Sequence, residues 1–221
     1  MLLRELSGND SFTIVGDLMQ GVRAFEGLTA WEQIQTPVFG NATLTPLRTS
    51  YRSTVDIMLF ASRVAKNRPV PGQMLARPVL RYGDPPSLHS FLEEKSRDIF
   101  LANAVEAMRA AGHKTIAIVA RDERRCAKLH KALPATLGAR LVTAGDTRYE
   151  GGVVVIPATL VKGLEFDCVV MADVSEAVYP DTDLDARLLY VCLTRPLHRL
   201  ICCSVGEVTP LLREAGDDRE C

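Results

Sequence analysis

The 221-residue sequence contains no G-x-x-x-x-G-K-[ST] loop, the glycine-rich segment in which many nucleotide-binding proteins hold phosphate. No apolar run approaches the ~20 residues of a membrane span, and the first residues, MLLRELSGND, lack the apolar core and cleavage site of a signal peptide. Basic residues are not in excess, since 26 Lys and Arg face 27 Asp and Glu, a net charge of −1. These absences predict a cytoplasmic protein with no membrane partner, whose contacts with nucleic acid are local or shared with sequence outside this chain.

Cysteine pairs typical of metal sites are also missing. The six cysteines form no C-x-x-C pair and have no nearby His at metal-binding spacing. Four of them, Cys168, Cys192, Cys202 and Cys203, lie within apolar runs. We therefore expect reduced, buried side chains and no metal site within this chain.

What is present is an alternation of short apolar runs with amphipathic segments, in a chain that is 47% apolar and 24% charged. Nearly continuous apolar runs are typical of strands that are buried on both faces of a parallel sheet. The pattern predicts an α/β domain with right-handed crossovers. The predicted strands are 11–17, 78–83, 115–120, 152–158, 168–174 and 200–205. The predicted helices are 53–67 with Ser53 as N-cap, 91–111, 122–133, 183–194 and 209–215, and the proline-rich residues 67–87 are expected to form a connecting loop.

Two segments imitate nucleotide-binding motifs. Residues 110–115, AAGHKT, resemble the end of a phosphate loop, but they lead into a predicted strand instead of opening a helix. In RDERR, residues 121–125, Asp122 and Glu123 follow a strand in the way that Mg²⁺-binding carboxylates do. Asp122 is better explained as the N-cap of the next helix, with Glu123 in its first turn.

Other segments are better candidates for a binding site. Gln20 follows an apolar run and is flanked by glycines, which would let it reach past the end of a strand, although taken alone the segment is better explained as a plain polar loop. Tyr51 and Arg52 are adjacent just before a predicted helix, where an aromatic ring could stack on a purine and a guanidinium could bind phosphate. A packing tyrosine and a surface arginine remain the alternative.

Two further candidates stand next to predicted strands. In PATLVKGLEFDCVV, residues 157–170, Lys162, Gly163 and Glu165 directly precede a buried run, where a glycine turn could present a carboxylate to a sugar hydroxyl. Arg195 ends the helix that contains LLYVCLTR and is followed by Pro196. A guanidinium held there could act as an arginine finger, or it could simply compensate the helix dipole.

Taken in order, VGDLMQGV, YRS, VKGLEFD and LLYVCLTR resemble motifs III, IV, V and VI of superfamily 1 helicases of the UvrD/Rep type. The IPATLVKGLEFD segment and the surroundings of Trp31 resemble the HelD-like members most. The resemblance implies a RecA-like parallel sheet with helices on both faces, of the P-loop NTPase type but without the P-loop. It also implies that residues 1–45 are a remnant of a first RecA-like domain and that residues 46–221 are the second.

In that family ATP lies between the two domains, and the resemblance assigns roles by motif position. Gln20 corresponds to the residue that senses the γ-phosphate or the attacking water, Tyr51 to the residue that stacks on adenine, and Arg52 to a γ-phosphate contact. Glu165 corresponds to the ribose-binding carboxylate, with Lys162 and Gly163 shaping its turn, and Arg195 to the arginine finger. The phosphate loop and the Mg²⁺ ligands are expected in the first domain, which is the implied partner, so we expect this chain alone to be inactive as an ATPase.

The sequence departs from the family mainly at positions that face nucleic acid. Phe25 keeps a base-stacking position, but Arg23 stands where tyrosine is usual and Glu26 where arginine is usual. Thr159 replaces the common histidine of motif V. Three functions remain open: a helicase or translocase on single-stranded DNA, a HelD-like factor that remodels RNA polymerase, and a protein that binds nucleotide or a partner without catalysis.

Overall fold

The computed structural model describes residues 13–21, 31, 33, 40, 43–47, 49–69, 77–78, 80–146 and 151–214. Its main feature is a six-stranded, all-parallel sheet with the strand order β3-β8-β7-β4-β6-β5. The strands are β3 (Ser87–Phe91), β4 (Thr115–Ala120), β5 (Arg140–Leu141), β6 (Gly152–Pro157), β7 (Phe166–Met171) and β8 (Pro196–Val205). A separate two-stranded sheet pairs β1 (Thr49–Ser50) with β2 (Arg77–Pro78).

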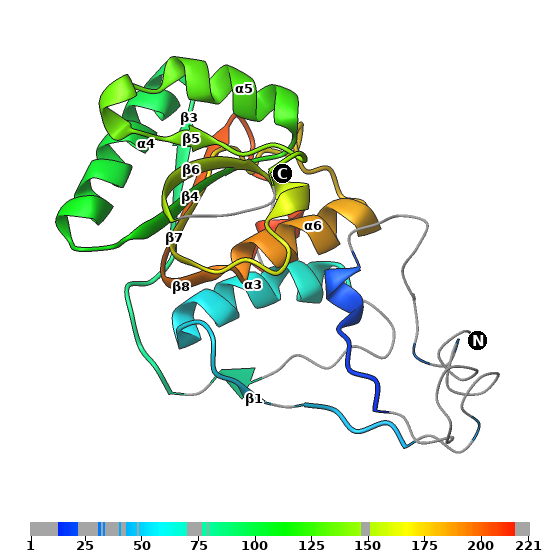
Figure 1. Ribbon diagram of the computed structural model, residues 1–221. Coiled ribbons are helices and arrows are strands. Elements are labelled where there is room, and N and C mark those ends of the chain that lie inside the picture. Colours follow the sequence, from blue (N-terminus) through cyan, green and yellow to red (C-terminus); the bar gives the residue numbers. More distant parts are fainter. Residues whose placement is uncertain are drawn as a thin grey trace.

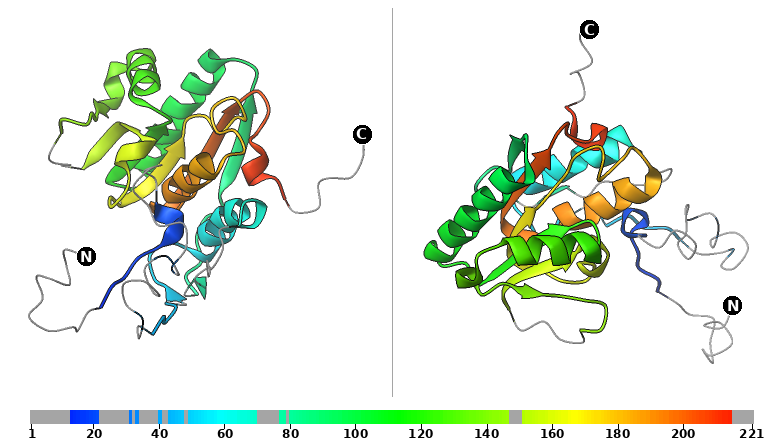
Figure 2. Two further views of the ribbon diagram at one scale, coloured as in Figure 1. Left: turned by 90° about the vertical axis from the view of Figure 1, so that its right-hand side faces the viewer. Right: turned by 90° about the horizontal axis from the view of Figure 1, so that it is seen from above.

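Helices cover both faces of the six-stranded sheet (Figure 1). On one face lie α3 (Val55–Asn67) and α6 (Asp183–Leu193), and on the other lie α4 (Glu94–Ala110) and α5 (Glu123–Ala132). Three-residue 3₁₀ turns, η1 (Leu18–Gln20), η2 (Ala135–Leu137), η3 (Ala158–Leu160) and η4 (Pro210–Leu212), join these elements. The two rotated views show the helices as layers on either side of the sheet (Figure 2).

The central strands alternate between two cores. In β4, Ala117 and Val119 belong to the core under α3 and α6, whereas Ile116 and Ile118 belong to the core under α4 and α5. Both sets are fully or almost fully buried. The nearly continuous apolar runs in the sequence thus reflect strands that are covered on both faces, as predicted.

Three sequence predictions are wrong in detail. Residues 13–17 of the strand predicted at 11–17 have no regular structure and are exposed, since no described strand lies beside them; residues 11–12 lie outside the described residues. Of the described residues in the strand predicted at 78–83, only Pro78 is in a strand, because proline has no N–H with which to continue the ladder; residue 79 lies outside the described residues. Residues 87–91, expected to be the end of a loop and the start of a helix, instead form β3, and α4 begins only at Glu94.

The other predicted strands and helices match described elements within a few residues, but the two-residue strands β1 and β5 were not predicted. Asp122 caps α5 as expected, with its side chain accepting a hydrogen bond from the Arg125 N–H. The predicted helix at 209–215 is shortened to η4. Within the described part of the chain, no helix combines the length and apolar character that crossing a membrane requires.

Candidate functional site

A cavity of about 570 Å³ brings together segments that are far apart in the sequence. Its volume lies within the range of small-molecule sites. It is lined by Asp17, Gln20, Ser50, Tyr51, Arg52, Ser53, Met58, Arg81, Glu165, Tyr190, Thr194, Arg195 and Leu197. Five residues singled out from the sequence, Gln20, Tyr51, Arg52, Glu165 and Arg195, are therefore neighbours in space.

The cavity lies at the amino-terminal edge of the sheet. Glu165 immediately precedes β7 and Arg195 immediately precedes β8, and these strands are parallel neighbours. The N–H of Phe166 donates to the carbonyl of Arg195 at 3.3 Å, which fixes the two segments side by side. Ligands of open α/β sheets usually bind at the opposite, carboxyl edge, so this site is not an ordinary mononucleotide crevice.

The segment that contains Tyr51 and Arg52 is held against β8 by Ser53. The Ser53 hydroxyl is buried and donates to the carbonyl of Pro196 at 2.7 Å. The prediction that Ser53 caps the following helix is wrong by one residue, because the Thr54 side chain accepts the hydrogen bond from the Ile57 N–H. The serine instead connects the loop before α3 to the residue that follows Arg195.

A tight turn precedes Glu165, as predicted. The Leu164 N–H donates to the carbonyl of Val161 at 3.1 Å, and Gly163 between them has φ +84°. A positive φ at the third position is what a type II turn requires, and glycine adopts it without steric cost. Lys162 and Gly163 are exposed and lie outside the cavity lining, so their place is in the turn that leads to Glu165.

Glu165 forms an ion pair with Arg52. The Arg52 Nε lies 2.6 Å from Glu165 Oε1, and the side chains are 40% and 47% exposed. An exposed pair of this kind is weakly stabilising, at about 0–1 kcal/mol, so a competing anion can break it at little cost. Both groups are therefore present in the cavity and neutralise each other there.

Arg195 is buried, with only 1% of its surface exposed. Its Nε donates to the carbonyl of Val191 at 2.9 Å and its Nη2 donates to the Thr194 hydroxyl at 3.2 Å, so it does compensate the end of α6. These bonds use two of the five guanidinium N–H groups and leave the other three without a hydrogen-bond partner among the described residues. Burial, together with the charge of Arg52, lowers the pKa of Arg195 from its ordinary value.

Tyr51 and Gln20 stand at the open side of the cavity. The side chain of Tyr51 is 78% exposed, so its ring is free to be covered by a ligand. Gln20 ends η1, and its Nε2 donates to Asp17 Oδ2 at 2.8 Å. Asp17 also caps η1 by accepting a hydrogen bond from the Met19 N–H, and Met19 is fully buried in the core beside α6.

Of the three residues predicted to face nucleic acid, only Thr159 is described, and it does not line this cavity. Thr159 is exposed on η3. Arg23 and Phe25 lie outside the described residues. Among the described residues, no group of three or more His, Cys, Asp or Glu side chains could hold a metal ion.

Three cavity residues with ionisable side chains, Asp17, Arg81 and Tyr190, were missed from the sequence. Tyr190 is nine-tenths buried, and burial raises its pKa to about 12, with the carboxylate of Asp17 acting in the same direction. Its position four residues before Thr194 on a helix could have indicated a shared face. No sequence pattern indicated Arg81, because it lies in the irregular segment between β2 and β3.

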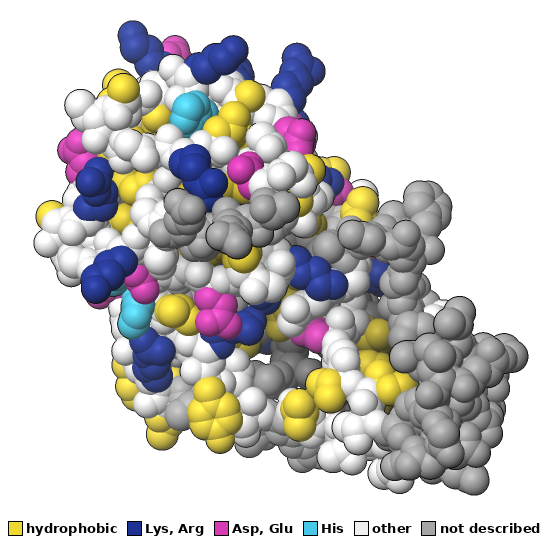
Figure 3. Space-filling view, viewed as in Figure 1, with side chains coloured by type: hydrophobic (Ala, Val, Ile, Leu, Met, Phe, Trp, Pro, Cys, Tyr) yellow, Lys and Arg dark blue, Asp and Glu magenta, His cyan; other side chains and the backbone are white. Residues whose placement is uncertain are grey.

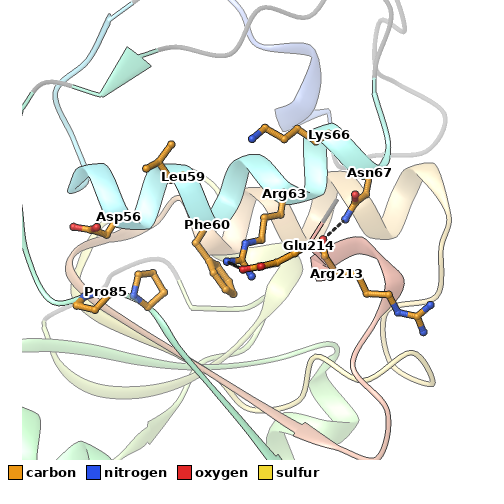
Figure 4. Close-up of a pocket in the computed structure, with 10 residues that line it drawn as sticks. Asp56, Leu59, Phe60, Arg63, Lys66, Asn67, Pro85, Arg213 and Glu214 are labelled. Atoms are coloured by element: carbon orange, nitrogen blue, oxygen red, sulfur yellow. Dashed lines mark hydrogen bonds and ion pairs between the residues drawn. The ribbon is translucent and has the colours of Figure 1, made fainter. Parts of the chain in front are cut away.

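A second cavity of about 470 Å³ lies on the outer side of α3 (Figure 4). Three of its polar side chains are already bonded to the protein, as Arg63 pairs with Glu214 and the Asn67 amide donates to three carbonyls around η4. Arg63 also lies over the ring of Phe60. The first cavity, with its open aromatic ring and partly unbonded guanidinium groups, is therefore the better candidate for a ligand site.

The donor set of the first cavity fits a nucleotide. An exposed aromatic ring can stack on a base, a carboxylate can accept from a sugar hydroxyl, and guanidinium groups bind phosphate in a fork. Arg52, Arg81 and Arg195 face only two carboxylates, those of Asp17 and Glu165, in the cavity lining. The excess positive charge favours an anionic ligand.

Comparisons with known proteins agree with this architecture. Residues 152–202 match the family model of the UvrD-like helicase C-terminal domain. The C-terminal domain of a possible DNA helicase from Lactobacillus plantarum WCFS1 has a similar structure, with a TM-score of 0.60 and 28% sequence identity over 74% of this chain and 92% of that one. No curated protein matches this chain. The predicted RecA-like α/β fold is confirmed, and so is the resemblance at the level of a UvrD-like helicase C-terminal domain.

Proposed function

We propose that this chain is the second RecA-like unit of an ATP-driven DNA helicase or translocase and that its cavity forms one wall of a shared ATP site. The observation that carries the proposal is the assembly of Tyr51, Arg52, Glu165 and Arg195 in a single cavity. These residues come from separate segments that the resemblance had assigned to one nucleotide.

The position of the cavity supports a shared site. A RecA-like unit that binds phosphate by itself does so at the carboxyl edge of its sheet, through a phosphate loop. Here the candidate residues are at the amino-terminal edge, and the sequence has no such loop. A unit of this kind can close over a nucleotide whose phosphates are held by another domain.

Each of the five cavity residues singled out from the sequence has a role in this proposal. Tyr51 stacks on the base, Glu165 accepts from a ribose hydroxyl, and Gln20 positions the attacking water. Arg52 and Arg195 bind the phosphates, and Arg195 stabilises the charge that develops during phosphoryl transfer. A second RecA-like domain supplies the phosphate loop and the Mg²⁺ ligands, and the metal neutralises phosphate charge.

Steady-state ATPase assays of the complete native protein, with and without single-stranded DNA, test this proposal. Arg195→Gln should lower kcat by about a thousandfold, the lower end of arginine-finger effects. Arg68→Gln is the matched control, because the only described residues that the Arg68 side chain bonds are Asp181 and Asp183, at the surface. The 221-residue chain alone should show no turnover. Unchanged kcat in Arg195→Gln, or rapid turnover by the isolated chain, would overturn the proposal.

Single-stranded DNA is the proposed nucleic-acid partner. The net charge of −1 includes a local cluster of basic residues, because α5 exposes Arg124, Arg125, Lys128 and Lys131. Arg125 pairs with Asp122 and Lys128 pairs with Glu94, and both pairs are at the surface, where a phosphate can compete for the cations. Basic side chains stand along the top of the molecule, where α5 runs (Figure 3). Basic surfaces of this type attract the phosphate backbone in a salt-dependent way.

A HelD-like factor that remodels RNA polymerase is the second candidate function. The near-neutral charge and the replacements at Arg23, Glu26 and Thr159 favour it, because they weaken the expected contacts with DNA bases. Strand displacement by the complete protein supports the helicase. ATP-dependent release of polymerase from DNA, without strand displacement, supports the remodelling factor.

A further inference from the structure

We propose that Arg81 is a third phosphate-binding residue of the cavity and acts beside Arg52 and Arg195. The proposal rests on the nucleotide site proposed above and extends it to a residue outside the four recognised motifs. Arg81 lies in the irregular segment between β2 and β3 and lines the same cavity as the other two arginines.

The backbone around Arg81 is fixed against the start of α3. Its carbonyl accepts a hydrogen bond from the Val55 N–H at 2.9 Å. Gly83 is so close to Thr54 that a Cβ atom on the glycine would lie 2.6 Å from the threonine methyl group. Arg81 therefore starts from a defined position, although it is outside any regular element.

The guanidinium group of Arg81 is held by neutral acceptors. Its Nη2 lies 2.8 Å from His198 Nδ1, and its Nη1 lies 3.5 Å from the carbonyl of Arg52. Burial and the nearby charge of Arg81 lower the pKa of His198, so the imidazole is neutral at neutral pH and accepts the hydrogen bond. These contacts orient the side chain without compensating its charge.

Other arginines in the described part of the chain show the contrast. Arg63, Arg68 and Arg121 each bond a carboxylate, whereas no carboxylate among the described residues lies within 4 Å of the Arg81 guanidinium. A fixed, uncompensated cation in a cavity that contains two further guanidinium groups is a site for an anion with several charged oxygens. The ligand chemistry is that of phosphate.

The phosphate could belong to a nucleotide or to a DNA backbone, and binding to the 221-residue chain separates them. The probes are inorganic tripolyphosphate, ADP and a twelve-residue oligothymidylate, each followed by two-dimensional NMR of backbone and arginine Nε–H groups. Arg81→Gln should raise the Kd for tripolyphosphate about tenfold, the effect expected of one charge-assisted hydrogen bond. A loss confined to tripolyphosphate and ADP assigns the site to nucleotide, and a loss confined to the oligonucleotide assigns it to the DNA backbone.

Two controls distinguish phosphate binding from support of the fold. Arg81→Lys keeps the charge and should recover most of the affinity, and it should also retain the dependence of log Kd on salt that Arg81→Gln reduces. A merely structural role would not move that salt dependence. If Arg52→Gln weakens tripolyphosphate binding and Arg81→Gln does not, this inference is wrong and the proposed function stands. If the wild-type chain binds none of the three probes, both fail.

Discussion

The guanidinium of Arg52 and the carboxylate of Glu165 hold each other at 2.6 Å across the candidate nucleotide site. In the free chain, Arg52, the proposed phosphate contact, is thus paired with Glu165, the proposed ribose contact. A nucleotide must separate the pair, and each partner then gains its own ligand group. Removing the carboxylate of Glu165 should therefore strengthen binding of the phosphate part of the ligand and weaken binding of its ribose part.

Glu165→Gln should strengthen the binding of inorganic tripolyphosphate, because Arg52 no longer has a carboxylate partner. The increase should be about three- to fivefold, the size of one exposed ion pair. The same substitution should reduce the preference for ADP over its 2′,3′-dideoxy analogue. Asp183→Asn is the matched control, since it removes an exposed Arg–carboxylate pair of the same 2.6 Å length at Arg68. Weaker tripolyphosphate binding in Glu165→Gln would show that Arg52 is not available to phosphate.

Ser53→Ala should lower the free energy of unfolding by about 1–2 kcal/mol, because the substitution leaves the carbonyl of Pro196 without its buried donor. Chemical denaturation measures the change. Ser62→Ala is the comparison, since the Ser62 hydroxyl bonds the carbonyl of Leu59 at the exposed surface of α3 and its loss should cost little. Equal effects of the two substitutions would contradict the role given to Ser53.

Gly163→Ala should destabilise the protein by about 1 kcal/mol, because φ +84° is unfavourable for any residue with a Cβ atom. It should also weaken ADP binding by displacing Glu165, which follows the turn. Gly145→Ala provides the control, as Gly145 has no positive φ and an added Cβ would make only an ordinary contact, 3.9 Å from the Thr143 hydroxyl oxygen. Thermal denaturation and ADP titration of both variants test the prediction. If Gly163→Ala binds ADP with wild-type affinity, the turn does not position Glu165 for binding.

The protein should lose stability as the pH falls below about 6.5, the ordinary pKa of histidine. Burial, Arg81 and His113 lower the pKa of His198 in the folded state, while Asp167 opposes them. The unfolded chain therefore binds the proton first, and stability is present above the unfolded pKa and lost as pH falls toward the lower folded value. His198→Asn should flatten this part of the stability profile, measured by urea denaturation from pH 8 to pH 5. An unchanged slope in the variant would exclude His198 as its source.

The sheet could largely be predicted from the sequence, because its inner strands are buried on both faces and are almost purely apolar. The range 115–120 matches β4 to the residue. β3 was missed because an edge strand alternates in burial and three of its five residues here, Ser87, His89 and Ser90, are polar. The run at 13–17 has strand-like composition, but composition does not reveal whether a neighbouring strand exists.

The site residues that belong to sequence motifs could be predicted. The residues that only the fold places in the cavity could not. Tyr51, Arg52, Glu165 and Arg195 were identified from their motif positions and lie together. Arg81 was not, because its place depends on the path of an irregular segment past α3. The bond from Ser53 to Pro196 joins residues 143 positions apart, a contact that no local pattern encodes.

An NMR titration of the ¹⁵N-labelled 221-residue chain with ADP tests the shared nucleotide site most directly, since it detects binding even at millimolar Kd. The shared nucleotide site predicts that chemical-shift changes concentrate at Tyr51, Arg52, Glu165 and Arg195, and that Tyr51→Ala raises the Kd for ADP. Shift changes centred instead on the cavity beside Arg63 and Glu214, or no changes at millimolar ADP, would contradict it.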